Sequence, residues 1–198
     1  MNARHHAVIV SAVRTPMGSF NGSYSSAPAT KLGSLAIAEA VNRLQLPGDR
    51  IDEVLMGCVL RAGLGQAPAR QAAIGAGLPH SVGAVTVNKV CGSSLQAVMM
   101  ATRAIALGEA NVMVAGGMEN MTRAPFLLEK ARQGYRLGHG ELIDSLIKDG
   151  LWDVYNQFHM GNAGELCAAK YRLSRQEVDD FALESYSRAS DAIARGAF

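Results

Sequence analysis

The chain has 198 residues, of which 48% are hydrophobic and 18% charged, and its formal net charge at pH 7 is +2. This composition predicts a globular protein with a buried core and excludes an intrinsically disordered chain. The small net charge gives no basis for nucleic-acid binding, and we see no apolar run near the ~18 residues of a membrane span. The N-terminus, MNARHHAVIV, lacks the long apolar region of a signal peptide, and the three cysteines are widely spaced. We therefore expect a cytoplasmic protein without disulfides, metal or membrane contact.

Up to residue 119 the sequence alternates short apolar runs with segments of helical periodicity. Strands are predicted at residues 6–13, 51–60, 83–88 and 110–119. Helices are predicted at residues 31–44, 67–78 and 93–109, with Pro68 and Gly108 marking a helix start and a helix end. Strands that alternate with helices predict an α/β domain, βαβαβαβ, with a mostly parallel, buried sheet. The third helix is apolar on nearly every face, so we expect it to lie between layers.

After residue 119 the chain becomes richer in aromatic and basic residues. Much of it reads as an excursion from the sheet, partly helical and partly loop. Its end is a predicted amphipathic helix in which Ser174 and Glu177 fit a capping box. We therefore predict two domains, an α/β domain at residues 1–119 and an incomplete accessory domain at residues 120–198.

Cys91 follows the third predicted strand and directly precedes the third predicted helix. The thiolate is the nucleophilic form of cysteine, and a helix N-terminus favours negative charge. Gly92 would let a substrate approach the backbone, whereas Ser93 or Ser94 would cap the helix. The position alone also fits a packed core cysteine, because free cysteine is among the most buried residue types.

The segment around Cys91, NKVCGSSLQAV, resembles the active-site signature of the thiolases, which make and cleave 3-ketoacyl-CoA. Four further segments resemble the same family in order and spacing: VIVSAVRTPMGSFNG at 8–22, DEVLMGCVLRAGLGQAPARQAAIGAGLP at 52–79, VMVAGGMENMTRAP at 112–125, and LIKDGLWDVYNQFHMGNAGELCA at 146–168. The resemblance covers nearly the whole chain. It implies a thiolase-like fold, of which this chain holds the N-terminal half and part of an inserted loop domain, with the second half absent.

Within the family the resemblance is strongest to acetyl-CoA acetyltransferases, which convert two acetyl-CoA to acetoacetyl-CoA and CoA, reversibly. It implies that Cys91 is the nucleophile that carries the acyl group. The expected helix start adds that the first-turn N–H groups, including the backbone N–H of Cys91, would help to stabilise an oxyanion. Leu151, His159 and Met160 match positions that line the substrate or pantetheine tunnel. The loop from Arg123 to Arg136 matches the segment through which such enzymes form tetramers, so a homodimer or homotetramer is expected. Many members have asparagine where Ala67 stands.

The resemblance also implies groups that this sequence does not show. Thiolase chemistry needs a histidine base and a second cysteine, which lie in the family's second half. We therefore expect the chain by itself to be inactive or nearly so. Coenzyme A thioesters would be substrates, with no metal or prosthetic group. A 3-ketoacyl-CoA thiolase of fatty-acid β-oxidation is the alternative, and a non-catalytic thiolase-fold remnant or partner-binding module is the alternative of another class.

Overall fold

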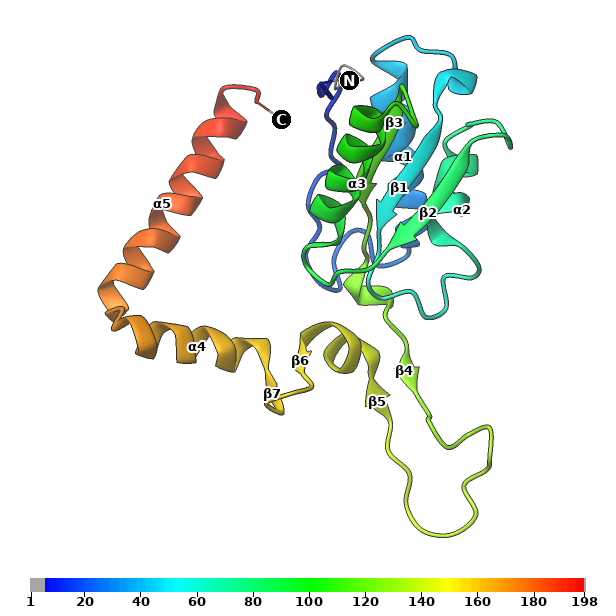
Figure 1. Ribbon diagram of the computed structural model, residues 1–198. Helices are drawn as coiled ribbons and strands as arrows, with labels where there is room; N and C mark the ends of the chain where they lie inside the picture. Colours follow the sequence, from blue (N-terminus) through cyan, green and yellow to red (C-terminus); the bar gives the residue numbers. More distant parts are fainter. Residues whose placement is uncertain (1–5, 198) are drawn as a thin grey trace. The chain divides into compact units, whose positions relative to one another are not determined.

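The computed structural model describes residues 6–197, and the chain divides into two compact units, Met1–Gly150 and Leu151–Phe198. The N-terminal stretch that was expected to lack a signal peptide falls partly in residues 1–5, which lie outside the described residues. Up to Gly117 the first unit alternates three α-helices with three strands (Figure 1): α1 (Ala29–Asn42), β1 (Glu53–Gly57), α2 (Pro68–Gly75), β2 (Gly83–Val87), α3 (Ser93–Leu107) and β3 (Met113–Gly117).

The three strands form one parallel sheet in the order β2-β1-β3. Glu53 of β1 pairs with Gly83 of β2 and with Met113 of β3, and the register continues without a bulge to Gly57. The central strand is the most buried, as a strand covered on both faces must be. This arrangement confirms the predicted α/β class with a parallel sheet.

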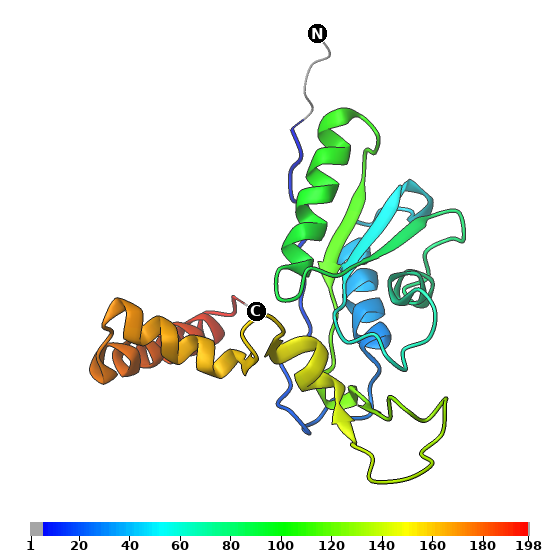
Figure 2. The same cartoon turned by 60° about the horizontal axis from the view of Figure 1, so that its bottom comes forward.

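Alternate residues of β1 face different helices. Val54 and Met56 belong to a core cluster that includes Ile37 of α1 and the buried alanines of α2, whereas Leu55 packs with Ala97 and Ala101 of α3. Both ribbon views show α1 and α2 on one face of the sheet and α3 on the other (Figures 1 and 2). The carboxyl ends of the three strands therefore meet at one edge, between the two helical layers.

The outer face of α3 is exposed, which corrects the expectation that this helix lies between layers. Ala97 and Ala101 are buried against the sheet, but Leu95 is 66% exposed and Leu107 is 72% exposed. Small side chains on one face allow the close approach to the sheet, whereas the larger apolar residues lie on the other face. The apolar composition of the helix predicted that every face would be buried. In the structure only the face that packs on the sheet is buried.

The same helix also corrects the expectation about membrane-spanning length. Together with the turn before it, α3 makes up the 18-residue segment Val90–Leu107, which is long and apolar enough by composition to cross a membrane. Its alanines pack on the sheet in the core cluster with Leu55. A helix that covers a sheet in this way can be as long and as apolar as a membrane span. Length and composition alone therefore do not distinguish the two.

The first predicted strand does not form. Residues 6–19 have no regular secondary structure, and the apolar side chains of Val8, Ile9 and Val10 are 64–82% exposed. None of these residues pairs with a strand in the described part of the chain. An apolar run has strand propensity, but a strand requires a neighbour with which to form a hydrogen-bonded ladder.

The helix-end signals at Pro68, Gly108 and Ser174 are confirmed. Pro68 is the first residue of α2, and Gly108 caps α3 in the left-handed conformation with φ 75°. Ser174 and Glu177 form the predicted capping box of the last helix, with both reciprocal bonds present.

Beyond β3 the chain leaves the sheet. Two short antiparallel strands, β4 (Phe126–Leu127) and β5 (Ile143–Asp144), flank an exposed loop, and a π-helical turn follows at Leu146–Leu151. The second unit contains two more short strands and two helices: β6 (Trp152–Asp153), β7 (Phe158–His159), α4 (Met160–Tyr171) and α5 (Arg175–Ala194). No residue of α4 or α5 is buried. The predicted division into residues 1–119 and 120–198 stays a prediction.

Candidate functional site

Cys91 lies in the short connection between β2, which ends at Val87, and α3, which begins at Ser93. Its side chain is exposed, and it forms no disulfide. The thiol is therefore not part of the core, in contrast to the packed cysteine that its position alone also fitted. An exposed thiol at the start of a helix is accessible to a reagent or substrate from solvent.

Two glycines allow the start of α3 to lie directly on the carboxyl edge of the sheet. A Cβ on Gly57, the last residue of β1, would lie 2.8 Å from the backbone nitrogen of Ser94. A Cβ on Gly117, the last residue of β3, would collide with the Ser94 hydroxyl. Only glycine fits at these two strand ends, and Cys91 is consequently held at the edge where ligands of open α/β sheets bind.

The turn that carries Cys91 is closed by the Ser93 hydroxyl. This oxygen accepts a hydrogen bond from the Lys89 N–H at 2.8 Å and donates one to the Val90 carbonyl at 2.6 Å. The N-cap of α3 is Gly92, without a side-chain cap bond. The prediction that Ser93 or Ser94 caps the helix is therefore wrong, because the Ser93 side chain bonds the preceding turn instead.

Cys58, which directly follows β1, has the opposite environment. It is 1% exposed, and its Sγ lies 3.8 Å from Oε1 of Glu119. Burial, together with the negative charge of Glu119, raises the pKa of the Cys58 thiol to about 12. Cys58 is therefore protonated and inert at neutral pH.

Glu119 holds the chain that follows Cys58. Its Oε2 accepts a hydrogen bond from the Val59 N–H at 2.7 Å, and its carboxylate also accepts from the Leu60 N–H. These bonds span some 60 positions in the sequence, and no local pattern predicts them. Such a carboxylate orients a backbone segment and is not free to act as a base.

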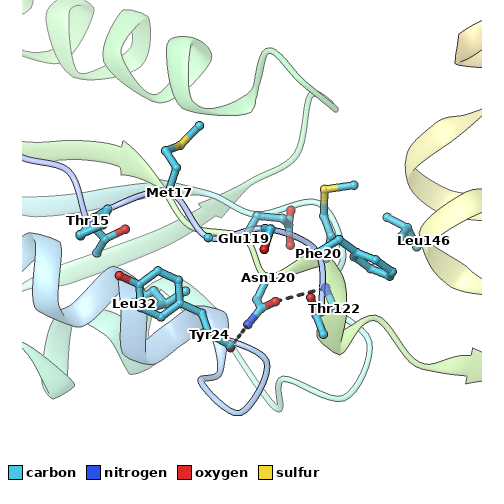
Figure 3. Close-up of a pocket in the computed structure, with 13 residues that line it drawn as sticks. Thr15, Met17, Phe20, Tyr24, Leu32, Glu119, Asn120, Thr122 and Leu146 are labelled. Carbon is cyan, nitrogen blue, oxygen red and sulfur yellow. Dashed lines mark hydrogen bonds between the residues drawn. The ribbon is translucent and has the colours of Figure 1, made fainter. Parts of the chain in front are cut away.

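A cavity of about 370 Å³ lies beside Glu119 and is lined by segments far apart in the sequence (Figure 3). The N-terminal loop contributes Thr15, Phe20 and Tyr24, and the stretch after β3 contributes Glu119 and Asn120. The Asn120 amide already donates to the carbonyls of Tyr24 and Ala27. The Glu119 carboxylate and the Asn120 amide are engaged in these hydrogen bonds, and Cys91 does not line the cavity.

Leu151, His159 and Met160 belong to the second unit and are described within it. Leu151 ends the π-helical turn and is half-buried, as is His159, whereas Met160 is 40% exposed. His159 is the N-cap of α4, and its Nδ1 accepts a hydrogen bond from the Gly161 N–H at 3.0 Å. A neutral His159 thus carries its proton on Nε2, where it can donate outward. The tunnel-lining role of these three residues stays a prediction.

The predicted assembly loop, Arg123 to Arg136, begins in a 3-10 turn and continues into the exposed loop between β4 and β5 (Figure 1). Lys130, Arg132 and Arg136 are all exposed. Within residues 6–197 no group of three or more His, Cys, Asp or Glu side chains is arranged to hold a metal ion.

The chain is similar to known proteins along nearly its whole length. The family model described as "Thiolase, N-terminal domain" matches residues 7–198. Acetyl-CoA acetyltransferase 2 of Arabidopsis thaliana is 55% identical over 190 residues, which are 96% of this chain and 47% of that protein. The acetyl-CoA acetyltransferase of Schizosaccharomyces pombe is 52% identical over 190 residues, 96% of this chain and 48% of that protein.

Relatives from animals are equally similar. A protein of Xenopus tropicalis named "Acetyl-CoA acetyltransferase, mitochondrial" is 52% identical over 188 residues, which are 95% of this chain and 44% of that protein. The chain thus spans about half the length of the curated relatives it matches.

Proposed function

The chain belongs to the thiolase family, and from that premise we propose that the polypeptide that carries it is an acetyl-CoA C-acetyltransferase. The proposal is supported by relatives of that name at 50–55% identity over most of this chain. The observation that carries it is the exposed thiol of Cys91, placed at the start of α3 on the carboxyl edge of the sheet. That combination supports a covalent acyl-transfer role for this cysteine.

In the first proposed step the Cys91 thiolate attacks the thioester carbonyl of acetyl-CoA. The new C–S bond forms, the bond to the CoA sulfur breaks, and CoA leaves as its thiol with the proton that Cys91 gave up. The acetyl group is then bound to Cys91 as a thioester. In the second step the carbanion of another acetyl-CoA attacks this thioester, so that acetoacetyl-CoA forms and the Cys91 thiol is released.

The second step requires a base that removes the proton next to the thioester carbonyl. The family resemblance assigns that base to the half that this chain does not span. Leu151, His159 and Met160 would contact the acyl-CoA, and Nε2 of His159 would donate a hydrogen bond to it. We propose coenzyme A thioesters as the substrates and assign no separate cofactor.

The partner and the cellular setting are part of the same proposal. The exposed basic loop supports association of the whole protein into a homodimer or homotetramer through residues Arg123 to Arg136. Three cysteines without a disulfide support a reducing compartment, and we propose the cytoplasm.

The test is the condensation reaction, assayed with the polypeptide as its own cell makes it. We expect acetyl-CoA to yield acetoacetyl-CoA, and peptide mass analysis during turnover to find an acetyl group on Cys91. Cys167 is also exposed, so it serves as the internal control for non-enzymatic acetylation. A Cys91→Ala variant with undiminished activity would refute the proposal.

A further inference from the structure

The residue before Cys91 has a strained backbone. Val90 has φ 48°, in the left-handed region. For a β-branched residue this conformation is a genuine outlier, because the side chain crowds the neighbouring carbonyl. Such a conformation persists only where the surrounding structure holds it, so the bonds that hold Val90 also determine how Cys91 is presented.

The main bonds come from Ser93, which is only 4% exposed. Its hydroxyl bridges the turn by accepting from the Lys89 N–H and donating to the Val90 carbonyl. The Ser93 backbone N–H donates to the same carbonyl at 3.1 Å. Because this hydroxyl is buried, water has little access to replace it. On the exposed side, Oδ1 of Asn88 accepts a bond from the Val90 N–H at 3.0 Å. The strained residue is thus fixed at both its N–H and its carbonyl.

Only Cys91 and Gly92 lie between Val90 and Ser93, so these bonds also fix the direction of the Cys91 side chain. We propose that Ser93 is a positioning residue for Cys91: its buried hydroxyl holds Val90 in the left-handed conformation and thereby keeps the thiol at the start of α3. Without that bridge Val90 relaxes to negative φ, and the thiol is no longer held at the start of α3. The inference rests on the proposed function only in taking Cys91 as the nucleophile.

The test measures alkylation by iodoacetamide at each cysteine of this chain, by peptide mass analysis. The ratio of the rate at Cys91 to the rate at Cys167 reports the presentation of Cys91, since both thiols are exposed in the same molecule. Protection of the buried Cys58 shows that each variant is folded. We expect Ser93→Ala to lower the ratio about tenfold, because it removes both hydroxyl bonds to the strained turn and leaves only the backbone bond from residue 93 to the Val90 carbonyl.

Three further variants separate positioning from a general structural effect. Ser94→Ala is the matched control, since the Ser94 hydroxyl bonds neither Lys89 nor Val90, and it should leave the ratio unchanged. Glycine adopts positive φ without strain, so the double variant Val90→Gly/Ser93→Ala should restore the ratio to within about twofold of the parent chain. Asn88→Ala, on the exposed side, should lower the ratio about threefold even where Ser93→Ala fails to fold.

The proposal is wrong if neither Ser93→Ala nor Asn88→Ala lowers the alkylation ratio. It is also wrong if Ser93→Ala lowers the ratio and the double variant Val90→Gly/Ser93→Ala does not restore it. Acetylation of Cys91 by acetyl-CoA is scored separately. If Ser93→Ala lowers the alkylation ratio but acetyl-CoA does not acetylate Cys91 in the parent protein, the positioning role of Ser93 stands and the proposed acetyltransferase activity is wrong. If acetyl-CoA acetylates Cys91 and the alkylation ratio is unchanged in Ser93→Ala, the acetyltransferase proposal stands and the positioning role of Ser93 is wrong.

Discussion

Two strand-to-helix connections of the first unit contain similar residues, but the cysteine is buried in one and exposed in the other. The connection from β1 to α2, residues 58–67, and the connection from β2 to α3, residues 88–92, each contain one cysteine and one left-handed residue other than glycine, Ala67 and Val90. Cys58 in the first is buried, whereas Cys91 in the second is exposed.

The difference lies in what each connection is tied to. The longer connection is pinned by Glu119 at Val59 and Leu60, and by Gln71, whose amide donates to the carbonyls of Leu64 and Gln66. The shorter one is tied to itself and to its own helix, through the Ser93 hydroxyl and through Gln96, whose side-chain oxygen accepts a hydrogen bond from Lys89 Nζ at 3.1 Å. A thiol at a strand end thus becomes core or surface according to the chain that follows it.

Among the substitutions, the largest expected effect comes from closing the gap between the sheet and α3. Gly57→Ala places a Cβ 2.8 Å from the Ser94 nitrogen, which is backbone and cannot rotate away. We expect a loss of about 3 kcal/mol in the free energy of unfolding, measured by denaturant titration with circular dichroism. Gly83→Ala on β2, where the nearest atom is at 3.5 Å, is the control and should cost under about 1 kcal/mol.

The next largest effect tests whether Glu119 distinguishes the two connections. Glu119→Ala leaves the N–H groups of Val59 and Leu60 without their carboxylate partner. We expect a loss of about 2 kcal/mol in the free energy of unfolding and faster alkylation of Cys58, with Cys91 unaffected. Equal changes at both cysteines would mean that the connections are not independent.

The raised pKa of Cys58 predicts a pH dependence of the free energy of unfolding. Its folded value of about 12 lies above its ordinary value of 9.0, so the folded state binds the proton more tightly. The corresponding stability is fully present below pH 9 and is lost as pH rises towards 12, by about 1.4 kcal/mol per pH unit. Comparison with Cys58→Ala isolates this contribution, because the variant should lack that slope. A slope that is equal in both proteins contradicts the assignment.

The smallest expected effect is a gain. Ala67 is left-handed, with φ 46°, and is the N-cap of α2 without a side-chain cap bond. Asparagine tolerates this conformation better than alanine does, so Ala67→Asn should raise the free energy of unfolding by about 0.5 kcal/mol. The thermal midpoint provides the measurement, and Ala67→Val should lower it. A decrease with asparagine would show that the position has another requirement.

The features that were predictable from the sequence are local ones. Pro68, Gly108 and the pair Ser174 and Glu177 act within one helical turn, so their spacing suffices to place helix ends. The alternation of strands and helices likewise predicted the parallel sheet. The strand expected at residues 6–13 failed because its pairing partner is not a property of the segment itself.

The site was predictable only in part for the same reason. The sequence places Cys91 between a strand and a helix, but its exposure depends on how the turn is tied down. Nothing in the local pattern indicates a left-handed valine, since β-branched residues rarely adopt that conformation. The Glu119 bonds to Val59 and Leu60 join segments that only the folded sheet brings together.

The pairing of Trp152 with His159 in the second unit has an optical consequence. Trp152 is the single tryptophan of the chain, it is 39% exposed, and its indole nitrogen lies 3.4 Å from the Gln157 side-chain oxygen. Its emission therefore reports the β6–β7 hairpin, whereas labelling of Cys58 reports the core around the sheet. Trp152 emission and Cys58 labelling, measured in the same denaturation experiment, would show whether the two units unfold together or one after the other.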